Sequence, residues 1–231
     1  MKFDLSNKNA LVTGGSSGIG KAIAETLKSQ GANVYVIDLI ESELNNSQGI
    51  NTIKTDITSS DDLKDVLKKI PDRIDLLINN AGVGLVGNIE KTEEEDFDRL
   101  YKVNVKGVYN CIKTFLPNMK ANGGAIINMA SIVSHVAVNN RFAYTMTKGA
   151  VHAMTFSIAK DYIHEGIRCN SVSPARVHTP FVDDYLSKNY PGKEKEMFKN
   201  LSQTQPLGRM GQPEEIANLV LYLSLIHISE P

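Results

Sequence analysis

The stretch NALVTGGSSGIGKAIAETLKSQGANVYVID, residues 9–38, decides the fold class of this chain. Its short apolar run at 9–13 is typical of a buried strand, and the glycine-rich turn at 14–20 leads into a helical pattern at 19–30. A β-branched and aromatic run at 33–38 predicts a second strand. Strand, glycine-rich turn, helix and strand in this order predict a βαβ unit with parallel strands.

The same alternation of apolar runs and amphipathic stretches continues along the chain. The apolar runs have few polar positions, as expected for parallel strands that are buried on both faces. We therefore predict an α/β fold, a three-layer doubly wound parallel sheet of the Rossmann type, as a single domain over residues 1–231. Further strands are predicted at 53–55, 74–79, 124–129 and 166–171, and further helices at 61–70, 92–120, 142–164 and 212–225.

Two of the later segments carry additional signals. The helix predicted at 92–120 has a capping-box pattern, with Thr92 at its N-cap and Glu95 three residues later, and Pro117 predicts a kink or a stop. An insertion at 178–210 separates the last predicted strand from the last helix. Because ligands bind beyond the carboxyl ends of parallel strands, we expect this insertion to be a substrate lid, with a mobile surface loop as the alternative.

Composition argues against several functional classes. The 231 residues include 25 Lys and Arg against 26 Asp and Glu, and this balance does not predict nucleic-acid binding. No apolar run reaches the ~18 residues of a membrane span, and the start has no signal-peptide pattern. The histidines have no metal-ligand spacing, so no metal is predicted. Cys111 and Cys169 form no CxxC pair, which favours a cytoplasmic location.

The glycine-rich turn predicts a dinucleotide site. Glycines let the backbone approach a diphosphate, and the first turn of the following helix offers free N–H groups. Asp38 lies 18 residues beyond Gly20, where a carboxylate accepts hydrogen bonds from the adenosine ribose and repels a 2′-phosphate. The sequence therefore predicts NAD as the cofactor, in preference to NADP.

Two alternatives exist for the same turn. Residues 15–21 also read G-x-x-x-x-G-K, which is close to the phosphate loop of nucleoside triphosphatases. Ala22 argues against this alternative, because that motif needs Ser or Thr to hold magnesium. The second alternative is that the glycines serve a tight turn and bind no ligand.

Tyr144 and Lys148 form a candidate acid–base pair. Their i, i+4 spacing at the start of a predicted helix directs both side chains to one face. We expect the Lys148 ammonium to lower the pKa of the Tyr144 phenol, which then exchanges a proton with an alcohol or a carbonyl. Ser131, after the fifth predicted strand, is expected to hydrogen-bond the same substrate oxygen.

These motifs together resemble the short-chain dehydrogenase/reductase family, over residues 3–223. The spacing of 13 between Ser131 and Tyr144 is also that of the family, and Ala175 stands where the family has Gly. The matching segments are TGGSSGIG at 13–20, Asp56-Ile57, NNAG at 79–82, Asn104 in VNVKG, Ser131 in INMAS, YTMTK at 144–148 and residues 174–179.

The resemblance implies roles for individual residues. It implies a catalytic tetrad of Asn104, Ser131, Tyr144 and Lys148, with Asn104 holding a proton-relay water near Lys148. It also implies a homo-oligomer, a dimer or a tetramer, formed through the helices that carry Asn104 and Tyr144. The cofactor-binding residues that it implies are Gly14, Ser17, Gly18, Ile19, Gly20, Asp38, Asp56, Ile57, Asn80, Ala81, Gly82, Tyr144, Lys148, Pro174, Val177 and Thr179.

Arg141 bears on the substrate. It lies three residues before Tyr144, about one helical turn away, where a guanidinium binds a carboxylate in bidentate fashion or else faces solvent or another subunit. The stretch NNRFAYTMTK resembles a subgroup of the family that includes 2-keto-3-deoxy-L-fuconate dehydrogenases and cytosolic type 2 3-hydroxybutyrate dehydrogenases. Arg176, in the predicted nicotinamide loop, faces substrate or solvent.

We therefore expect an NAD-dependent oxidoreductase that interconverts a secondary alcohol and a ketone on a small hydroxy or keto acid, including a sugar acid. Its predicted substrate residues are Ser131, Arg141 and Tyr144. The alternatives are a 3-oxoacyl carrier-protein reductase, a polyol or sugar dehydrogenase and, in a different class, a non-catalytic dinucleotide-binding regulator.

The end of the sequence departs from the family pattern. After PEEIANLVLYL the family continues to T-G-x-x-x-x-V-D-G-G and a seventh strand, whereas this sequence reads SLIHISEP at 224–231. We expect the tail at 224–231 to be foreign to the family and the final strand to be missing. The sixth strand is then an unpaired edge of the sheet.

Overall fold

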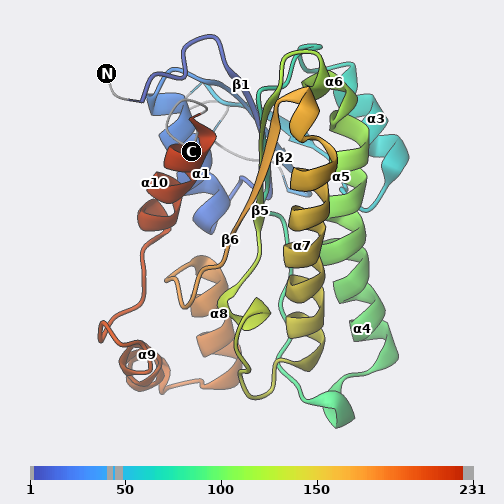
Figure 1. The fold of residues 1–231 in the computed structure, drawn as a ribbon. Helices are drawn as coiled ribbons and strands as arrows, with labels where there is room; N and C mark the ends of the chain where they lie inside the picture. Colours follow the sequence, from blue (N-terminus) through green and yellow to red (C-terminus); the bar gives the residue numbers. More distant parts are fainter. Residues whose placement is uncertain (1–2, 41–43, 45–48, 226–231) are drawn as a thin grey trace.

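Six parallel strands in the order β3-β2-β1-β4-β5-β6 form the middle layer of the molecule. This arrangement confirms the predicted doubly wound α/β fold. The computed structural model describes residues 3–40, 44 and 49–225 (Figure 1). The strands are β1 (Asn9–Thr13), β2 (Asn33–Asp38), β3 (Asn51–Lys54), β4 (Leu76–Asn79), β5 (Gly124–Met129) and β6 (Ile167–Val172).

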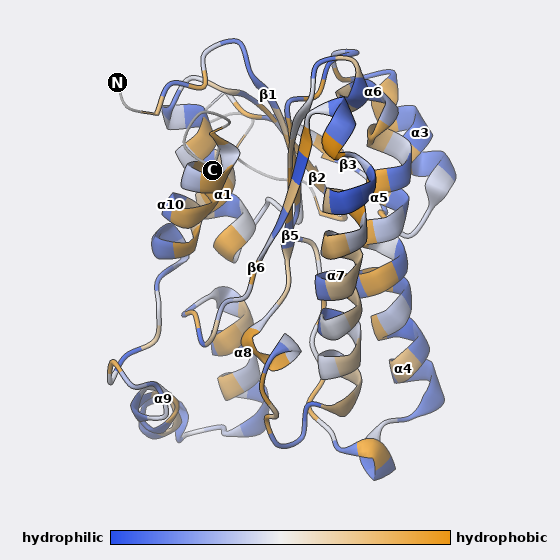
Figure 2. Cartoon of the chain, in the orientation of Figure 1, coloured by the Kyte–Doolittle hydropathy of each residue, from blue (hydrophilic) through white to orange (hydrophobic). Residues whose placement is uncertain are grey.

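Helices cover both faces of the sheet, and further helices lie beyond its carboxyl ends. In Figure 1, α1 and α10 pack on one face, and α3, α5 and α7 pack on the other. Figure 2 shows α9, which lies away from the sheet, as mainly hydrophilic. The helices are α1 (Gly18–Ser29), α3 (Ser60–Leu67), α4 (Glu94–Tyr101), α5 (Gly107–Phe115), α6 (Pro117–Lys120), α7 (Phe142–Asp161), α8 (Pro180–Asn189), α9 (Glu194–Gln203) and α10 (Pro213–Ser224).

Two apolar clusters hold these layers together. On one face, Ile23 of α1 and Val220 of α10 pack in a cluster with Val12 of β1. On the other face, Phe115 of α5 and neighbouring side chains pack in a cluster with Leu11. The neighbours Leu11 and Val12 serve opposite faces because side chains alternate along a strand, which is why the strands read as continuous apolar runs.

The helix predicted at 92–120 is confirmed over most of its length, but it begins at Glu94 and is divided into several helical segments. The Thr92 hydroxyl donates to the carbonyl oxygen of Asn88 at 2.7 Å, so Thr92 ends a short 3₁₀ helix and does not cap α4. Glu93 is the N-cap of α4, and a π-helical segment, Lys102–Lys106, separates α4 from α5. The stop predicted at Pro117 is confirmed, because α5 ends before it and α6 begins at it.

The other predicted elements agree with the structure to within a few residues at their ends. The predicted insertion at 178–210 contains α8 and α9, which lie beyond the carboxyl ends of the strands (Figure 1). Among the described residues, β6 pairs with β5 alone. Most of the tail predicted to be atypical, at 226–231, lies outside the described residues. None of the helices within 3–40, 44 and 49–225 is long and apolar enough to cross a membrane.

Hydrogen bonds of Thr13 link the two central strands of the sheet, β1 and β4. Its hydroxyl oxygen accepts hydrogen bonds from the backbone N–H groups of Asn80 and Ala81, both at 3.0 Å. The Asn80 side chain donates in return to the carbonyl oxygens of Thr13, at 3.1 Å, and Gly14, at 2.9 Å. These bonds join the carboxyl ends of β1 and β4, between which the strand order reverses and where ligands bind in sheets of this type.

We predict that Thr13→Val destabilises the protein by about 2 to 3 kcal/mol, because two N–H groups lose their acceptor while the side-chain shape is kept. Denaturant unfolding measures this loss. Thr52→Val on β3 is the matched control and should change stability by less than about 0.5 kcal/mol. Equal effects of the two substitutions would contradict the role given to Thr13.

Candidate active site

The turn between β1 and α1 requires glycine at several positions. Gly14 has a left-handed φ of 64°, and a Cβ there would lie 2.7 Å from Cα of Ala81. A Cβ on Gly20 would overlap the carbonyl oxygen of Gly14 and the side chain of Asn80. The backbone of the turn therefore packs directly against the segment that follows β4, as a phosphate-binding turn does.

The same turn has unused hydrogen-bonding groups. Ser17 is the N-cap of α1, but its side chain makes no capping bond, and the first turn of α1 has no acidic side chain. The Ser16 hydroxyl is buried and has no partner among the described residues. Free N–H groups at a helix start, with an unpartnered hydroxyl beside them, fit the diphosphate of a dinucleotide. The residues of the turn therefore fit the predicted cofactor.

Asp38 lies at the end of β2, beside the turn. One carboxylate oxygen accepts the backbone N–H of Ser16 at 3.0 Å, and the other accepts that of Ile40 at 3.4 Å. The carboxylate is thus held in place next to the helix start. A fixed carboxylate at this position suits ribose hydroxyls and repels a phosphate.

The other predicted adenosine contacts lie around the same edge of the sheet. The Asp56 carboxylate accepts the N–H of Thr58 at 2.8 Å, and Asn110 on α5 donates to the carbonyl oxygen of Ile57 at 3.1 Å. The Ile57 side chain packs against Gly107, where a Cβ would lie 2.6 Å from it. These bonds place the Asp56-Ile57 segment between β3 and α5.

The segment predicted to line the nicotinamide follows β6. The carbonyl oxygen of Pro174 accepts the N–H of Ile132 at 2.9 Å, and Val177 forms a β-bridge with Gly211. Thr179 is the N-cap of α8, and a Cβ on Gly18 would lie 3.5 Å from its side chain. The fold therefore brings the start of α8 next to the start of α1.

Asn104 is buried within the π-helical segment. Its side chain accepts the N–H of Val83 at 2.8 Å and donates to the Val83 carbonyl oxygen at 2.8 Å and to the Thr147 hydroxyl at 3.1 Å. A Cβ on Gly82 would lie 3.2 Å from Asn104 Oδ1 and 3.5 Å from Lys148 Nζ. Asn104 thus ties the loop after β4 to α7, close to Lys148.

Ser131, Tyr144 and Lys148 converge from two elements. Ser131 follows β5 and caps the short helix at Ile132–Ser134, and Tyr144 and Lys148 lie on the first turns of α7. Lys148 Nζ is buried, donates to the carbonyl oxygen of Met129 at 2.7 Å and lies 5.8 Å from the centre of the Tyr144 ring. The structure therefore brings these three predicted catalytic residues together.

The pKa shifts of Tyr144 and Lys148 differ from those predicted from the sequence. Burial raises the pKa of Tyr144, while a hydrogen bond with Ser131 and the charge of Arg141 oppose this shift. Burial lowers the pKa of Lys148 to about 8. The expected lowering of the Tyr144 pKa by Lys148 is not found, because the Lys148 ammonium is directed to Met129 and the nearby charge is that of Arg141.

Arg141 is the N-cap of α7, and its Nη1 donates to the carbonyl oxygen of Leu85 at 3.2 Å. Its backbone forms a β-bridge with Gly87, so the loop after β4 holds Arg141 at the edge of the site. Two supporting residues, Thr13 and Thr147, were not predicted from the sequence. Their hydroxyls act through partners distant in sequence, and no local pattern indicates this.

Comparison with known proteins gives consistent matches. A family model described as enoyl-(acyl carrier protein) reductase matches residues 14–225. The chain is 40% identical over 225 residues to "Dehydrogenase/reductase SDR family member 6" of Aquarana catesbeiana, covering 95% of this chain and 91% of the relative. It is 35% identical over 226 residues to the 2-keto-3-deoxy-L-fuconate dehydrogenase of Xanthomonas campestris pv. campestris, covering 95% and 75% of the two chains.

A solved structure agrees with these sequence matches. The ligand-free aldohexose dehydrogenase of Thermoplasma acidophilum superposes with a TM-score of 0.87 at 31% identity. The match covers 96% of this chain and 88% of that one. The similarity therefore extends over the strands, the turn and the helices described above.

We predict that Lys148→Met makes the cofactor-free protein more stable below about pH 8. In the folded wild type, Lys148 loses its proton at its lowered pKa of about 8. In the unfolded chain it loses this proton only at the ordinary lysine pKa of ~10.4. Burial of the charged ammonium therefore lowers the free energy of unfolding by its full amount below pH ~8. This destabilisation decreases between pH ~8 and pH ~10.4, and it is absent at higher pH. Unfolding free energies over this pH range measure the difference.

Lys160→Met, on the exposed side of the same helix, is the matched control and should show no such pH-dependent gain. A Lys148→Met protein that is less stable than the wild type at neutral pH would contradict the burial of a charged Lys148.

Proposed function

Since this chain belongs to the short-chain dehydrogenase/reductase family of oxidoreductases, which act on CH–OH groups, we propose a finer assignment within it. The protein is an NAD-dependent enzyme that interconverts a secondary alcohol and a ketone on a small hydroxy or keto acid, including a sugar acid. The observation that carries this proposal is the Arg141 guanidinium, held one helical turn from Tyr144 by Leu85 and acting on the Tyr144 pKa.

The cofactor assignment rests on Asp38. Its carboxylate is fixed by the N–H of Ser16 at the start of the phosphate-binding turn, where the adenosine ribose is expected. Ser17, Gly18, Ile19 and Gly20 would hold the diphosphate, and Asp56, Ile57 and Asn80 would contact the adenosine half. Pro174, Val177 and Thr179 would line the nicotinamide. When bound, the dinucleotide accepts the hydride from the alcohol or returns it to the ketone.

The remaining chemistry belongs to side chains of this chain. In the oxidation, Tyr144 takes the proton from the substrate hydroxyl, and in the reduction it returns this proton to the carbonyl oxygen. Ser131, which hydrogen-bonds Tyr144, donates to the same substrate oxygen as charge develops on it. Lys148, held by Met129 with its Nζ 5.8 Å from the centre of the Tyr144 ring, would contact the nicotinamide ribose of the bound dinucleotide beside the reacting phenol. Asn104 fixes the loop beside Lys148.

The names of the matched proteins support two substrate classes. One relative is a 2-keto-3-deoxy-L-fuconate dehydrogenase, whose named substrate is an acid, and the solved structure is an aldohexose dehydrogenase, whose named substrates are neutral sugars. Arg141 favours the acid, because a guanidinium binds a carboxylate strongly and gains little from a neutral hydroxyl. A neutral sugar or polyol is the second candidate.

We further propose a cytoplasmic homo-oligomer. Cys111 and Cys169 are free and buried, and burial raises the pKa of the Cys169 thiol to about 12, which suits a reducing compartment.

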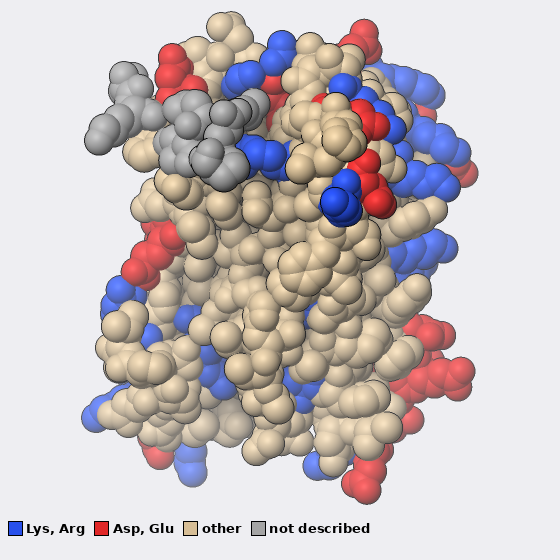
Figure 3. All heavy atoms as spheres, viewed as in Figure 1, with Lys and Arg blue, Asp and Glu red and all other residues tan. Residues whose placement is uncertain are grey.

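The surface over α7 supports the homo-oligomer. Phe156 on α7 is 62% exposed and Tyr109 on α5 is 47% exposed, and Figure 3 shows a broad uncharged area over α7. A second copy of the chain would cover this surface, and light scattering in solution tests for it.

We predict that Asp38→Asn raises the NADP-to-NAD ratio of kcat/KM by roughly 100-fold, because it removes the charge that repels a 2′-phosphate. Asparagine can still accept the N–H of Ser16, so the turn is kept. Initial rates with both cofactors measure the ratio. Asp62→Asn on the exposed side of α3 is the control, and a ratio that does not move in Asp38→Asn would refute the NAD assignment.

We predict that Arg141→Ala raises KM for hydroxy acids at least ~10-fold more than KM for neutral alcohols, because only the acid loses a charge-assisted contact. Steady-state kinetics on matched pairs of substrates give this comparison. Arg99→Ala on α4, which removes an arginine paired with Asp96, should change neither value. An equal effect of Arg141→Ala on both substrate classes would favour the sugar or polyol alternative.

A further inference from the structure

A second arginine lies near Arg141, on a different segment. Arg176 belongs to the loop between β6 and α8, three residues before the N-cap of α8. Its carbonyl oxygen accepts the N–H of Gly211 at 2.8 Å, and its N–H donates to Gln205 Oε1 at 3.4 Å. Two hydrogen bonds thus hold the backbone of Arg176, and the residue is half-buried.

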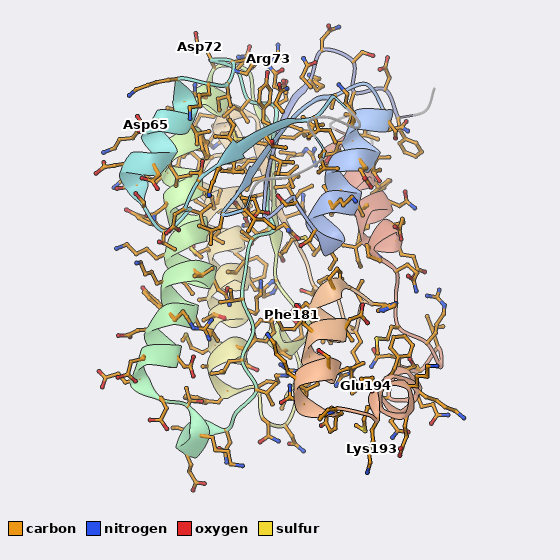
Figure 4. All side chains as sticks on the ribbon, turned by 180° about the vertical axis from the view of Figure 1, so that it is seen from behind. Asp65, Asp72, Arg73, Phe181, Lys193 and Glu194 are labelled. Atoms are coloured by element: carbon orange, nitrogen blue, oxygen red, sulfur yellow. The ribbon has the colours of Figure 1, made fainter. Side chains whose placement is uncertain are left out.

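The loop that holds Arg141 contacts α8, the helix that follows Arg176. The Arg141 guanidinium donates to the carbonyl oxygen of Leu85, and the adjacent Gly84 contacts α8, because a Cβ there would lie 2.8 Å from the Phe181 ring. Figure 4 shows Phe181 on the side of α8 that faces this loop. Tyr185 lies one turn further along α8, on the same face as Phe181.

The charges of the two arginines act on each other and on this helix. Burial lowers the pKa of Arg176, and the positive charge of Arg141 adds to this shift. Burial and the neighbouring Tyr190 raise the pKa of Tyr185, and the charges of Arg141 and Arg176 both oppose this shift, so the two guanidiniums lie within electrostatic range of the α8 tyrosine. The charge of Arg141 also opposes the burial that raises the pKa of Tyr144, so Arg141 acts on the reacting group.

Within residues 3–40, 44 and 49–225, no carboxylate lies at ion-pair distance from Arg141 or Arg176. Three other arginines contrast with them, because Arg73, Arg99 and Arg209 each pair with a carboxylate. Two half-buried like charges without a counterion repel each other, and an anion between them removes the repulsion. The site therefore suits a ligand that brings its own negative charge.

We propose that Arg141 and Arg176 together hold one carboxylate of the substrate, which makes Arg176 a second specificity-determining residue. Arg141 keeps donors beyond the one used by Leu85, and a carboxylate has acceptor positions for both guanidiniums. Arg141 is the N-cap of α7 and Arg176 lies just before α8, so the carboxylate lies between the starts of these two helices. This inference rests on the proposed function and deepens it.

The position of the pair also limits the length of the substrate. Arg141 and Tyr144 are three residues apart, a rise of about 4.5 Å along a helix. A carboxylate held beside Tyr144 lies only a few bonds from the carbon that bears the reacting hydroxyl. The substrate class is therefore a short 2- or 3-hydroxy acid and its keto acid, with the carboxylate close to the reacting carbon.

Binding without turnover tests the site first. We expect malonate and 3-hydroxybutyrate to raise the melting temperature of the wild type and 2-butanol to leave it unchanged, because only the acids bring a carboxylate to the pair. Arg141→Ala and Arg176→Ala should each abolish the acid-dependent rise, and Arg176→Lys should restore part of it. Lys193→Gln, which removes an exposed charge after α8 without touching the pair, should respond like the wild type (Figure 4). A wild type that does not respond to either acid overturns the proposal.

Kinetics then test whether the two arginines share one carboxylate. Each single alanine variant should raise KM for 3-hydroxybutyrate at least ~10-fold more than KM for 2-butanol, and Arg176→Lys should recover part of the loss. The double variant should lose less than the product of the two single losses, because both contacts end on the same group. Losses that multiply, or an unchanged KM for the acid in Arg176→Ala, overturn the proposal.

Different results would refute the proposed function and the proposal of the arginine pair. A wild type that turns over neutral sugars with NAD but shows no carboxylate response would keep the oxidoreductase and refute the arginine pair. A carboxylate response with no turnover on any alcohol would support the pair and refute the proposed reaction.

Discussion

The two hydrogen bonds that Thr13 Oγ1 accepts from the backbone of Asn80 and Ala81 join the centre of the sheet at the point where its strand order reverses. Asn80 completes this connection by donating to the carbonyl oxygens of Thr13 and Gly14. The phosphate-binding turn is therefore built against the loop after β4. That loop in turn contacts Asn104, Arg141 and α8, so the site depends on this connection.

Burial and charge then determine what the site can do. Lys148 is enclosed and donates to Met129, so its ammonium lies in surroundings that disfavour charge. Tyr144 is also disfavoured as an anion, and Arg141 opposes this effect. A site with several cations and few anions favours a substrate and a reaction intermediate that carry negative charge. The same property underlies both the acid–base chemistry and the proposed preference for hydroxy acids.

The sequence predicts the parts that follow from local patterns. The apolar runs of β1, β2 and β5 appear with the predicted bounds, and the spacing of Tyr144 and Lys148 correctly places them on one helix face. The start predicted at Thr92 for the helix over 92–120 is misplaced, because the Thr92 hydroxyl donates to the carbonyl oxygen of Asn88. The capping-box pattern does not reveal this contact. The pKa directions and the Arg141–Arg176 pair depend on contacts between distant segments, so they required the fold.

The central claim is that Tyr144 carries the proton in an NAD-dependent reaction of an alcohol or a ketone. The most direct test compares the wild type and Tyr144→Phe in two measurements, NADH binding by fluorescence and hydride transfer to NAD from 3-hydroxybutyrate in a single turnover. We expect NADH binding within about 3-fold of the wild type and hydride transfer slower by about 10²- to 10⁴-fold. Hydride transfer at the wild-type rate in Tyr144→Phe, with binding intact, would contradict the account.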